Sequence, residues 1–242
     1  MNTVIITRPE ASVALSSEIY QNQGFKVFEA PCFSIKTNES LPAQWLEVAT
    51  EVWVILSVHA LQHALVIAPA LKPGNNTQVI AVGPAVEQAW KQHFDHDIIY
   101  HPWMNSEGVI ELLKGIEPTS VKILTTDGGR SLIKSHCMKQ CISYAQLNTY
   151  LRTPLTVDQV GLLNVYQNKV SSQPVLTITS CGILTELMSQ LTTELAELVL
   201  AKPIVVGAQR IADLANELGF LDIHLASSPS DQAMCDAVKK LN

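Results

Sequence analysis

The chain has 242 residues, of which 47% are hydrophobic and 16% charged, a composition typical of globular domains and not of disordered chains. With 16 basic residues against 22 acidic ones its net charge is −6, which disfavours nucleic acid or an anionic membrane as the partner. No apolar run approaches the roughly 18 residues of a membrane helix, and the opening MNTVIITRPE lacks a signal-peptide pattern. We therefore expect a cytoplasmic protein of one large or two modest domains.

Six short runs rich in Val, Ile and Leu recur along the chain and are almost continuously hydrophobic. They lie at residues 3–7, 51–57, 78–83, 121–126, 175–180 and 203–207. Helix-like stretches follow most of these runs, at 11–24, 59–68, 85–94 and 210–219, and Gly219 is expected to end the last one. Continuous hydrophobicity is typical of strands covered on both faces, so the pattern predicts an α/β fold with parallel sheets.

The chain also resembles itself at a nearly constant spacing. The matched pairs are Ser57 with Ser180, Gly83 with Gly207, and Ser106 with Ser230, at offsets of 123, 124 and 124 positions. A weaker match joins VIITRPEASVAL near the N-terminus to KILTTDGGRSLI in the middle of the chain. A steady offset through several elements predicts two similar halves of roughly 120 residues each.

The turns that follow the apolar runs are the candidate binding site, because ligands bind beyond the carboxyl ends of the strands in an open parallel sheet. Each turn precedes a helix, whose first N–H groups and positive dipole end suit a carboxylate or a phosphate. The candidate residues are Thr7, Arg8, Ser57, Val58, His59, Gly83, Ala85, Val86, Ser180, Cys181, Gly182, Gly207, Ala208 and Gln209, with 125–130 as a further turn. Neither Ser57 nor Ser180 lies in G-x-S-x-G, so we expect a helix-capping or ligand-anchoring hydroxyl at each and not a nucleophile.

The usual motifs for nucleotides and metals are missing. No G-x-G-x-x-G follows the first apolar run, no P-loop motif occurs, and DGGR at 127–130 is a lone glycine-rich turn. The five cysteines form no C-x-x-C pair. His59 and His63, like His93 and His96, have a spacing expected on helices but no Cys or carboxylate at motif distance. We therefore expect no metal ion and no disulfide framework.

The stretch SYAQLNTYLRTPL at 143–155 lies near the midpoint between the two similar halves. In an extended segment, Tyr150 and Arg152 would share one face, and Leu147 and Thr149 the other. Without further information, an ordinary edge strand with an aromatic side chain packed on it is the expected structure.

Taken in order, these segments resemble the uroporphyrinogen-III synthase family over essentially the whole chain. The resemblance rests on VIITRPE, GFKVFEAPCF, VILSVHAL and VIAVGPA, and further along on HPWMNSEGVIELL, KILTTDGGRSLI, TYLR, LTITS and IADLANELGF. It implies two flavodoxin-like doubly wound parallel-sheet domains joined by a two-stranded β linker. The implied bounds are 1–35 plus 154–242 for a discontinuous domain 1, 39–148 for an inserted domain 2, and 36–38 and 149–153 for the linker strands.

The resemblance also implies a reaction in tetrapyrrole (heme) biosynthesis. Hydroxymethylbilane, a linear tetrapyrrole with acetate and propionate groups, would be cyclised to uroporphyrinogen III with loss of water and inversion of ring D, without cofactor or metal. Turns of both domains would bind the carboxylates through backbone N–H groups. Tyr150 matches the family's tyrosine in the linker strand, facing the interdomain cleft, and its phenol would assist departure of the hydroxyl. The family further implies a monomer, with hydroxymethylbilane synthase as the source of a handed-over substrate.

Four places depart from the family pattern, and the carry-over of individual binding residues is weakened there. They are Thr125-Thr126, where Arg-Gly is usual, 139–143, which lacks the usual glycine, His59, where some members have arginine, and Ala208-Gln209, which replaces a Pro/Ser-Thr type pair.

Two other interpretations stay open. One is a non-catalytic two-domain protein that binds an anionic metabolite, such as a degenerate paralogue. The other, weaker one is a flavin- or nucleotide-binding doubly wound enzyme. Turnover of hydroxymethylbilane separates the first from the synthase, and absorbance near the flavin band tests the second.

Overall fold

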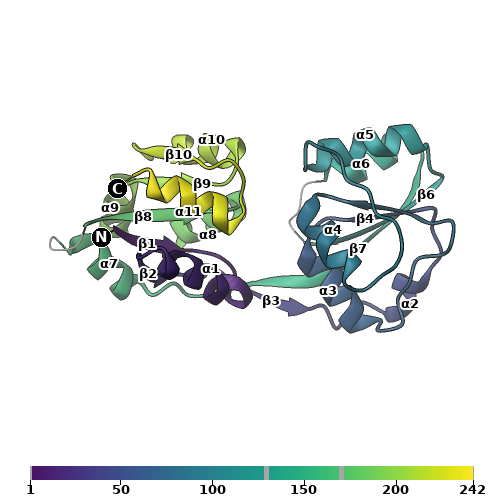
Figure 1. Ribbon diagram of the computed structural model, residues 1–242, viewed down its shortest axis with the longest axis horizontal. Coiled ribbons are helices and arrows are strands. Elements are labelled where there is room, and N and C mark those ends of the chain that lie inside the picture. The colour runs from purple at the N-terminus through teal and green to yellow at the C-terminus, as the bar shows by residue number, and fades with distance from the viewer. Residues whose placement is uncertain (1, 128–130, 169–171, 242) are drawn as a thin grey trace. The chain divides into compact units, whose positions relative to one another are not determined.

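The computed structural model describes residues 2–127, 131–168 and 172–241 (Figure 1). The chain divides into two compact units: unit 1 comprises Met1–Ile35 and Thr153–Asn242, and unit 2 comprises Lys36–Arg152. Both divisions fall inside strands, namely β3 (Phe33–Thr37) and β7 (Ser143–Pro154).

Unit 1 is built on a five-stranded parallel sheet in the order β10-β9-β8-β1-β2. Its strands are β1 (Asn2–Ile6), β2 (Lys26–Glu29), β8 (Ser172–Ile178), β9 (Ile204–Val206) and β10 (Ile223–Leu225). The central strand β1 pairs with β2 on one side and with β8, from the C-terminal part of the chain, on the other. This is the strand order of a doubly wound sheet whose topological switch point lies between β1 and β8.

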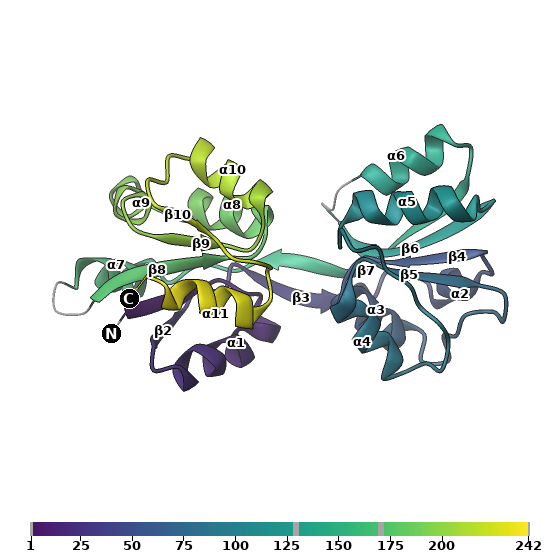
Figure 2. The same cartoon turned by 45° about the horizontal axis from the view of Figure 1, so that its top comes forward.

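Helices cover both faces of the unit 1 sheet (Figure 2). They are α1 (Glu10–Asn22), α7 (Gln159–Gln167), α8 (Cys181–Gln190), α9 (Thr193–Leu200), α10 (Gln209–Glu217) and α11 (Asp231–Lys239). Val4 and Ile6 of β1 pack with α1 and α11, whereas Ile5 packs with α7 to α10, as the alternation of side chains along a strand requires. Gly219, at φ +94°, follows α10 in the left-handed conformation, so the predicted end of this helix is confirmed.

Unit 2 contains the second sheet, in the order β3-β7-β6-β4-β5. Besides β3 and β7, its strands are β4 (Val52–Ile55), β5 (Gln78–Ala81) and β6 (Ser120–Thr126). The ladders β4–β5, β4–β6 and β6–β7 are parallel. The hydrogen bonds Asn38 N–H to Thr149 O and Leu155 N–H to Cys32 O, at 3.0 and 2.9 Å, show that β3 runs antiparallel to β7.

The helices of unit 2 also lie on both faces of its sheet (Figure 2). They are α2 (Ala43–Glu47), α3 (Val58–Ile67), α4 (Pro84–Lys91), α5 (Ser106–Ile116) and α6 (Leu132–Lys139). One face packs Val121 and Ile123 of β6 against Leu113 of α5 and Cys137 of α6. The α/β class predicted from the apolar runs and the doubly wound sheets implied by the family resemblance are therefore confirmed.

The two sheets repeat one another along the chain, as the internal spacing predicted. β4, β5, β6 and β7 of unit 2 correspond to β8, β9, β1 and β2 of unit 1, because both sets occur in the same order in their sheets. The bridge between Ile80 and Ile99 takes the place of the β9–β10 ladder, in which Val205 pairs with His224. Val205 lies 125 positions after Ile80, and His224 lies 125 positions after Ile99. The structural offset in this region is therefore one residue longer than the sequence match suggested.

Three sequence expectations need correction. The strand β7 lies between β3 and β6 and is not an edge strand. Its register with β6 shifts between Thr125 and Thr126, and Thr149 and Tyr150 do not face opposite sides, because both contact α3, through the carbonyl oxygen of Ala60 and the ring of His63. Finally, α4 ends at Lys91, so residues 93 and 96 lie beyond this helix and do not share a helical face.

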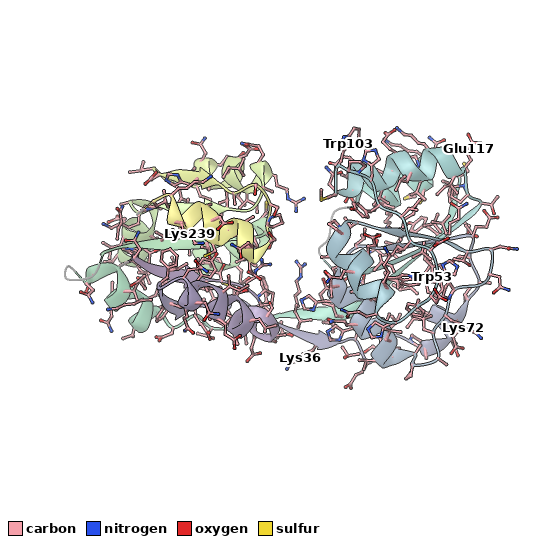
Figure 3. The ribbon with its side chains drawn as sticks, viewed as in Figure 1. Lys36, Trp53, Lys72, Trp103, Glu117 and Lys239 are labelled. Atoms are coloured by element: carbon pink, nitrogen blue, oxygen red, sulfur yellow. The ribbon has the colours of Figure 1, made fainter. Side chains whose placement is uncertain are left out.

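Unit 2 also buries a lysine. Lys122 lies in the middle of β6 with 0% of its surface exposed, and its Nζ donates a hydrogen bond to the carbonyl oxygen of Leu46 in α2. The same Nζ lies 4.3 Å from the ring centroid of Trp53, which is labelled in Figure 3. Burial lowers the pKa of Lys122 to about 8.

Candidate functional site

The serine turns stand at corresponding places in the two units, at the carboxyl ends of β4 and β8. Ser57 Oγ accepts a hydrogen bond from the N–H of Ala60 at 3.0 Å and begins α3. Ser180 Oγ accepts one from the N–H of Ile183 at 3.2 Å and begins α8. The predicted capping role of both serines is confirmed, and each helix directs its first turn toward the carboxyl edge of its own sheet.

The glycine turns follow β5 and β9, but the two glycines are not strictly equivalent. Gly83 is itself the N-cap of α4, whereas Gly207 lies one residue before Ala208, the N-cap of α10. A Cβ at Gly207 would lie 2.7 Å from Pro229, so only glycine fits there. A Cβ at Gly83 would lie 3.5 Å from Met104, which is an ordinary contact. Packing against a neighbouring loop therefore explains Gly207 but does not require glycine at position 83.

In unit 1, the side chains of the turn after β1 form contacts within the unit. Thr7 is buried and its Oγ1 donates to the carbonyl oxygen of Thr177 at 2.8 Å. Arg8 forms an ion pair with Asp231 in the first turn of α11, with Nε to Oδ1 at 3.0 Å, and also donates to the carbonyl oxygen of Pro229. Of this pair of predicted binding residues, Arg8 already has an anionic partner within its unit.

The remaining predicted residues of unit 1 gather at the beginnings of two adjacent helices. Cys181 opens α8, and its Sγ lies 3.6 Å from the carbonyl oxygen of Arg210 in α10. Gly182 and Gln209 are exposed beside them, and Gln209 Nε2 donates to Asp213 within α10. Ala208 caps α10 through its backbone only. The structure thus brings the Ser180 and Gly207 turns together at one edge of the sheet.

In unit 2, Val58 and His59 form the half-buried first turn of α3, Ala85 is exposed, and Val86 is buried in the core with 3% exposed surface. Val86 therefore has only its backbone to offer a ligand. The predicted turn at 125–130 is described only as far as Asp127, whose Oδ1 accepts a hydrogen bond from Asn148, and residues 128–130 lie outside the described residues.

Tyr150 lies at the centre of a polar and aromatic cluster in unit 2. Only 2% of its surface is exposed, and its hydroxyl lies 3.2 Å from Ser57 Oγ. The ring centroids of His59 and His63 lie 5.8 and 5.7 Å from that of Tyr150, and the His63 ring is stacked on it. His63 Nδ1 is hydrogen-bonded to Thr37 Oγ1 at 2.9 Å, and burial lowers the pKa of His63, which favours the neutral ring.

The phenol of Tyr150 is thus packed, as expected for an aromatic side chain on this strand, but on a central strand of the sheet and not on an edge strand. The register shift in β7 turns Tyr150 inward, and Thr126 Oγ1 fixes its backbone by donating to the Tyr150 carbonyl oxygen at 2.8 Å. Ser57 is half-buried, so its hydroxyl is closer to solvent than the phenol of Tyr150. The cluster thus brings two hydroxyl groups and two imidazole rings together, with the Ser57 hydroxyl beside that of Tyr150.

One basic residue near the turns was not singled out from the sequence. Arg210 is exposed in the first turn of α10, directly after Gln209, where a cation can meet an anion bound at the helix N-terminus. The signal was available, because Arg210 follows the repeated strand–Gly turn within three residues. Among the described residues no group of three or more His, Cys, Asp or Glu side chains is placed to hold a metal ion, and no described helix is long and apolar enough to cross a membrane.

Two doubly wound sheets, one fully parallel and one with an antiparallel edge strand, each with capped helix N-termini at its carboxyl edge, define a two-domain α/β protein. The sequence matches the family described as Uroporphyrinogen-III synthase HemD over residues 14–236. The chain belongs to the uroporphyrinogen-III synthase family.

Solved structures agree with this assignment at the level of the fold. A mutant uroporphyrinogen III synthase from Thermus thermophilus matches with a TM-score of 0.67 and 12% identity, over 99% of this chain and 98% of that one. Uroporphyrinogen-III synthetase from Helicobacter pylori matches with a TM-score of 0.64 and 14% identity, over 100% of both chains. Comparison with curated protein sequences gives no match.

Proposed function

We propose that this protein is a uroporphyrinogen-III synthase, which cyclises hydroxymethylbilane to uroporphyrinogen III with inversion of ring D. The observation that carries the proposal is the family match over residues 14–236. The turn series supports it, because helix N-termini at the carboxyl edge of each sheet suit a substrate with acetate and propionate groups on every ring. We further propose a cytoplasmic monomer that receives its substrate from hydroxymethylbilane synthase.

The proposed chemistry begins with loss of the terminal hydroxyl of hydroxymethylbilane as water, which leaves a cation-like azafulvene. The substituted carbon of ring D attacks this centre to form a spiro intermediate, which opens and recloses with ring D inverted, and a proton is released. The sum is the loss of one water, so the reaction consumes no oxidant or reductant. Because the same substrate closes without inversion in solution, the protein's main task is to hold the chain in the conformation that leads to the spiro intermediate.

The Tyr150–Ser57 pair is the proposed proton source for the departing hydroxyl. Since Tyr150 is buried and its hydroxyl faces Ser57 Oγ, the proton would reach the substrate from Ser57, while Tyr150 returns one to Ser57. We expect Tyr150→Phe to lower kcat by less than about 100-fold, because positioning contributes more than acid catalysis here. The fold should persist, since only one hydrogen bond of about 1 kcal/mol is lost. An unchanged kcat would show that the phenol plays no part.

The decisive experiment generates hydroxymethylbilane in situ with its synthase, adds this protein, oxidises the products and separates the type I and type III uroporphyrin isomers. Predominance of type III supports the proposal. Type I alone, from protein with a cooperative unfolding transition, would favour a non-catalytic protein that binds an anionic metabolite. The observation that favours this second candidate is the burial of Tyr150.

A further inference from the structure

The loop that follows the Ile80–Ile99 bridge carries two large apolar side chains at the carboxyl edge of the unit 2 sheet. Trp103 is 59% exposed and Met104 is 56% exposed. Figure 3 shows Trp103 on the outside of unit 2, by one end of α5. Met104 packs on Gly83, the glycine of the turn between β5 and α4, so the loop lies beside a candidate binding turn.

The loop is held firmly in place. The N–H of Trp103 donates to His101 Nδ1 at 3.2 Å, and the two rings meet edge to face with centroids 4.5 Å apart. His101 in turn lies so close to Gly108 in α5 that a Cβ there would be 2.8 Å from it. Asn105 Oδ1 accepts from the N–H of Gly108 at 2.8 Å and begins the helix. The indole therefore stands on a backbone that these hydrogen bonds hold, with the His101 ring against it.

Met104 is also strained, with φ +48°. Two other non-glycine residues among those described share a positive φ, Glu117 at 52° and Cys141 at 56°. Both of these end or follow a helix, where the left-handed conformation is a normal way to satisfy the last carbonyl groups. Met104 ends no helix, so the cost of its conformation needs another explanation, and strained residues outside helix ends concentrate at binding sites.

Comparison with unit 1 shows that the fold does not need the apolar side chains. The corresponding loop there contacts Gly207 through Pro229, as Met104 contacts Gly83, and Ser228 occupies the place of Trp103 at the same offset of 125 positions. Ser228 Oγ is hydrogen-bonded to Ser230 Oγ at 2.9 Å. A small polar residue thus suffices to form this loop in unit 1, so the loop conformation does not require the indole of unit 2.

We propose that Trp103, which precedes Met104 in this loop, stacks on a pyrrole ring of the bound linear tetrapyrrole. The inference rests on the function proposed above and names a positioning residue for it. The N–H groups at the helix N-termini suit the carboxylates of the substrate but offer no aromatic face to its flat pyrrole rings. The exposed indole beside them provides that face. The indole would stack on the ring in the bound substrate as well as in the transition state. The contact therefore contributes to substrate binding more than to kcat.

The test compares W103A, W103S, which copies the residue of unit 1, and W103F, which keeps an aromatic face. The matched control is W45A, because Trp45 in α2 is also exposed, at 51%, but lies away from the turns. In the coupled assay, W103A and W103S should raise KM about three- to tenfold with kcat within about twofold of wild type, while W103F and W45A stay near wild type. Thermal melting should be unchanged in all four variants, since Trp103 is mainly exposed.

An unchanged KM in W103A, an equal rise in W45A, or a fall in kcat at constant KM would each overturn the inference. A titration with uroporphyrin III, followed by porphyrin emission, separates this result from failure of the proposed function, because it needs no turnover. If wild type makes no type III isomer yet binds uroporphyrin III, and W103A binds it about three- to tenfold more weakly, the function fails and the ring contact stands. If wild type shows neither turnover nor binding, both are overturned.

Discussion

The two serine turns make the same helix cap but have different surroundings. Ser180 in unit 1 caps α8, and its hydroxyl has no other hydrogen bond among those found in the described residues. Ser57 in unit 2 caps α3 and also meets the hydroxyl of Tyr150, behind which His63 is stacked. The repeated backbone therefore accounts for the cap, whereas the side chains around Ser57 are particular to unit 2.

A similar contrast separates the central strands. In unit 1, β1 holds the apolar residues Val4, Ile5 and Ile6, all nearly fully buried, whereas in unit 2 β6 buries Lys122 at the corresponding central position of the sheet. Duplicated units thus provide internal controls, because a feature found in only one copy is not required by the shared architecture. The predictions below use these controls.

The largest expected effect concerns Lys122. Below about pH 8, the lysine is charged in both the folded and the unfolded chain, and the folded state bears the full cost of burying it. As the pH rises from about 8 toward 10.5, the folded lysine becomes neutral while the unfolded one still binds its proton, so stability increases. Relative to K122M, wild type should therefore gain about 2–3 kcal/mol of unfolding free energy between about pH 7.5 and pH 10.

Urea unfolding of both proteins at the two pH values measures this gain. Taking the difference removes the contribution of Tyr20 and Tyr166, whose pKa values burial raises in both proteins alike. Parallel pH profiles for wild type and K122M would show that Lys122 keeps an ordinary pKa in the folded protein.

The second prediction sets Gly207→Ala against Gly83→Ala. The added methyl group meets Pro229 at 2.7 Å in the first variant and Met104 at 3.5 Å in the second. G207A should therefore lose about 1–3 kcal/mol of unfolding free energy through overpacking, while G83A should stay within about 0.5 kcal/mol of wild type. Equal losses in urea unfolding would mean that the two glycine turns share one packing constraint after all.

The smallest expected difference is that between Ser57→Ala and Ser180→Ala. Each variant removes a helix cap at a cost of about 1 kcal/mol. S57A also leaves the buried Tyr150 hydroxyl without its partner, so it should cost about 1–2 kcal/mol more than S180A. Adding Tyr150→Phe to S57A should recover that extra cost, and a double variant no more stable than S57A would contradict the pairing.

The sequence predicted the central strands well because they are apolar throughout, as β4 with its fully buried Val52–Ile55 shows. The apolar runs alone did not mark β2 and β10, which lie at the edges of the unit 1 sheet, with β2 showing exposed residues at both ends and β10 half exposed. Edge strands carry a weak hydrophobic signal because one side has no neighbouring strand to cover it.

For the candidate site, the sequence located the turns and the two serine caps, because strand ends and capping residues have local signatures. It did not predict the one-residue register shift between β6 and β7, nor the contact of the Tyr150 hydroxyl with Ser57. Such a shift changes the face of every later side chain and leaves no local sequence signal when the extra residue is a threonine. The ion pair between Arg8 and Asp231 could not be predicted either, since the two residues meet only in the tertiary structure.

The position of β1 between β2 and β8 has a consequence for how the protein is made. As the chain leaves the ribosome, Lys36–Arg152 is contiguous and can fold as soon as β7 has emerged. The first 35 residues must wait, because the neighbour of β1 on one side, β8, is synthesised only after the whole of Lys36–Arg152. The apolar strand β1 is thus without this neighbour on the nascent polypeptide until β8 has emerged, and chaperones can protect it during that interval.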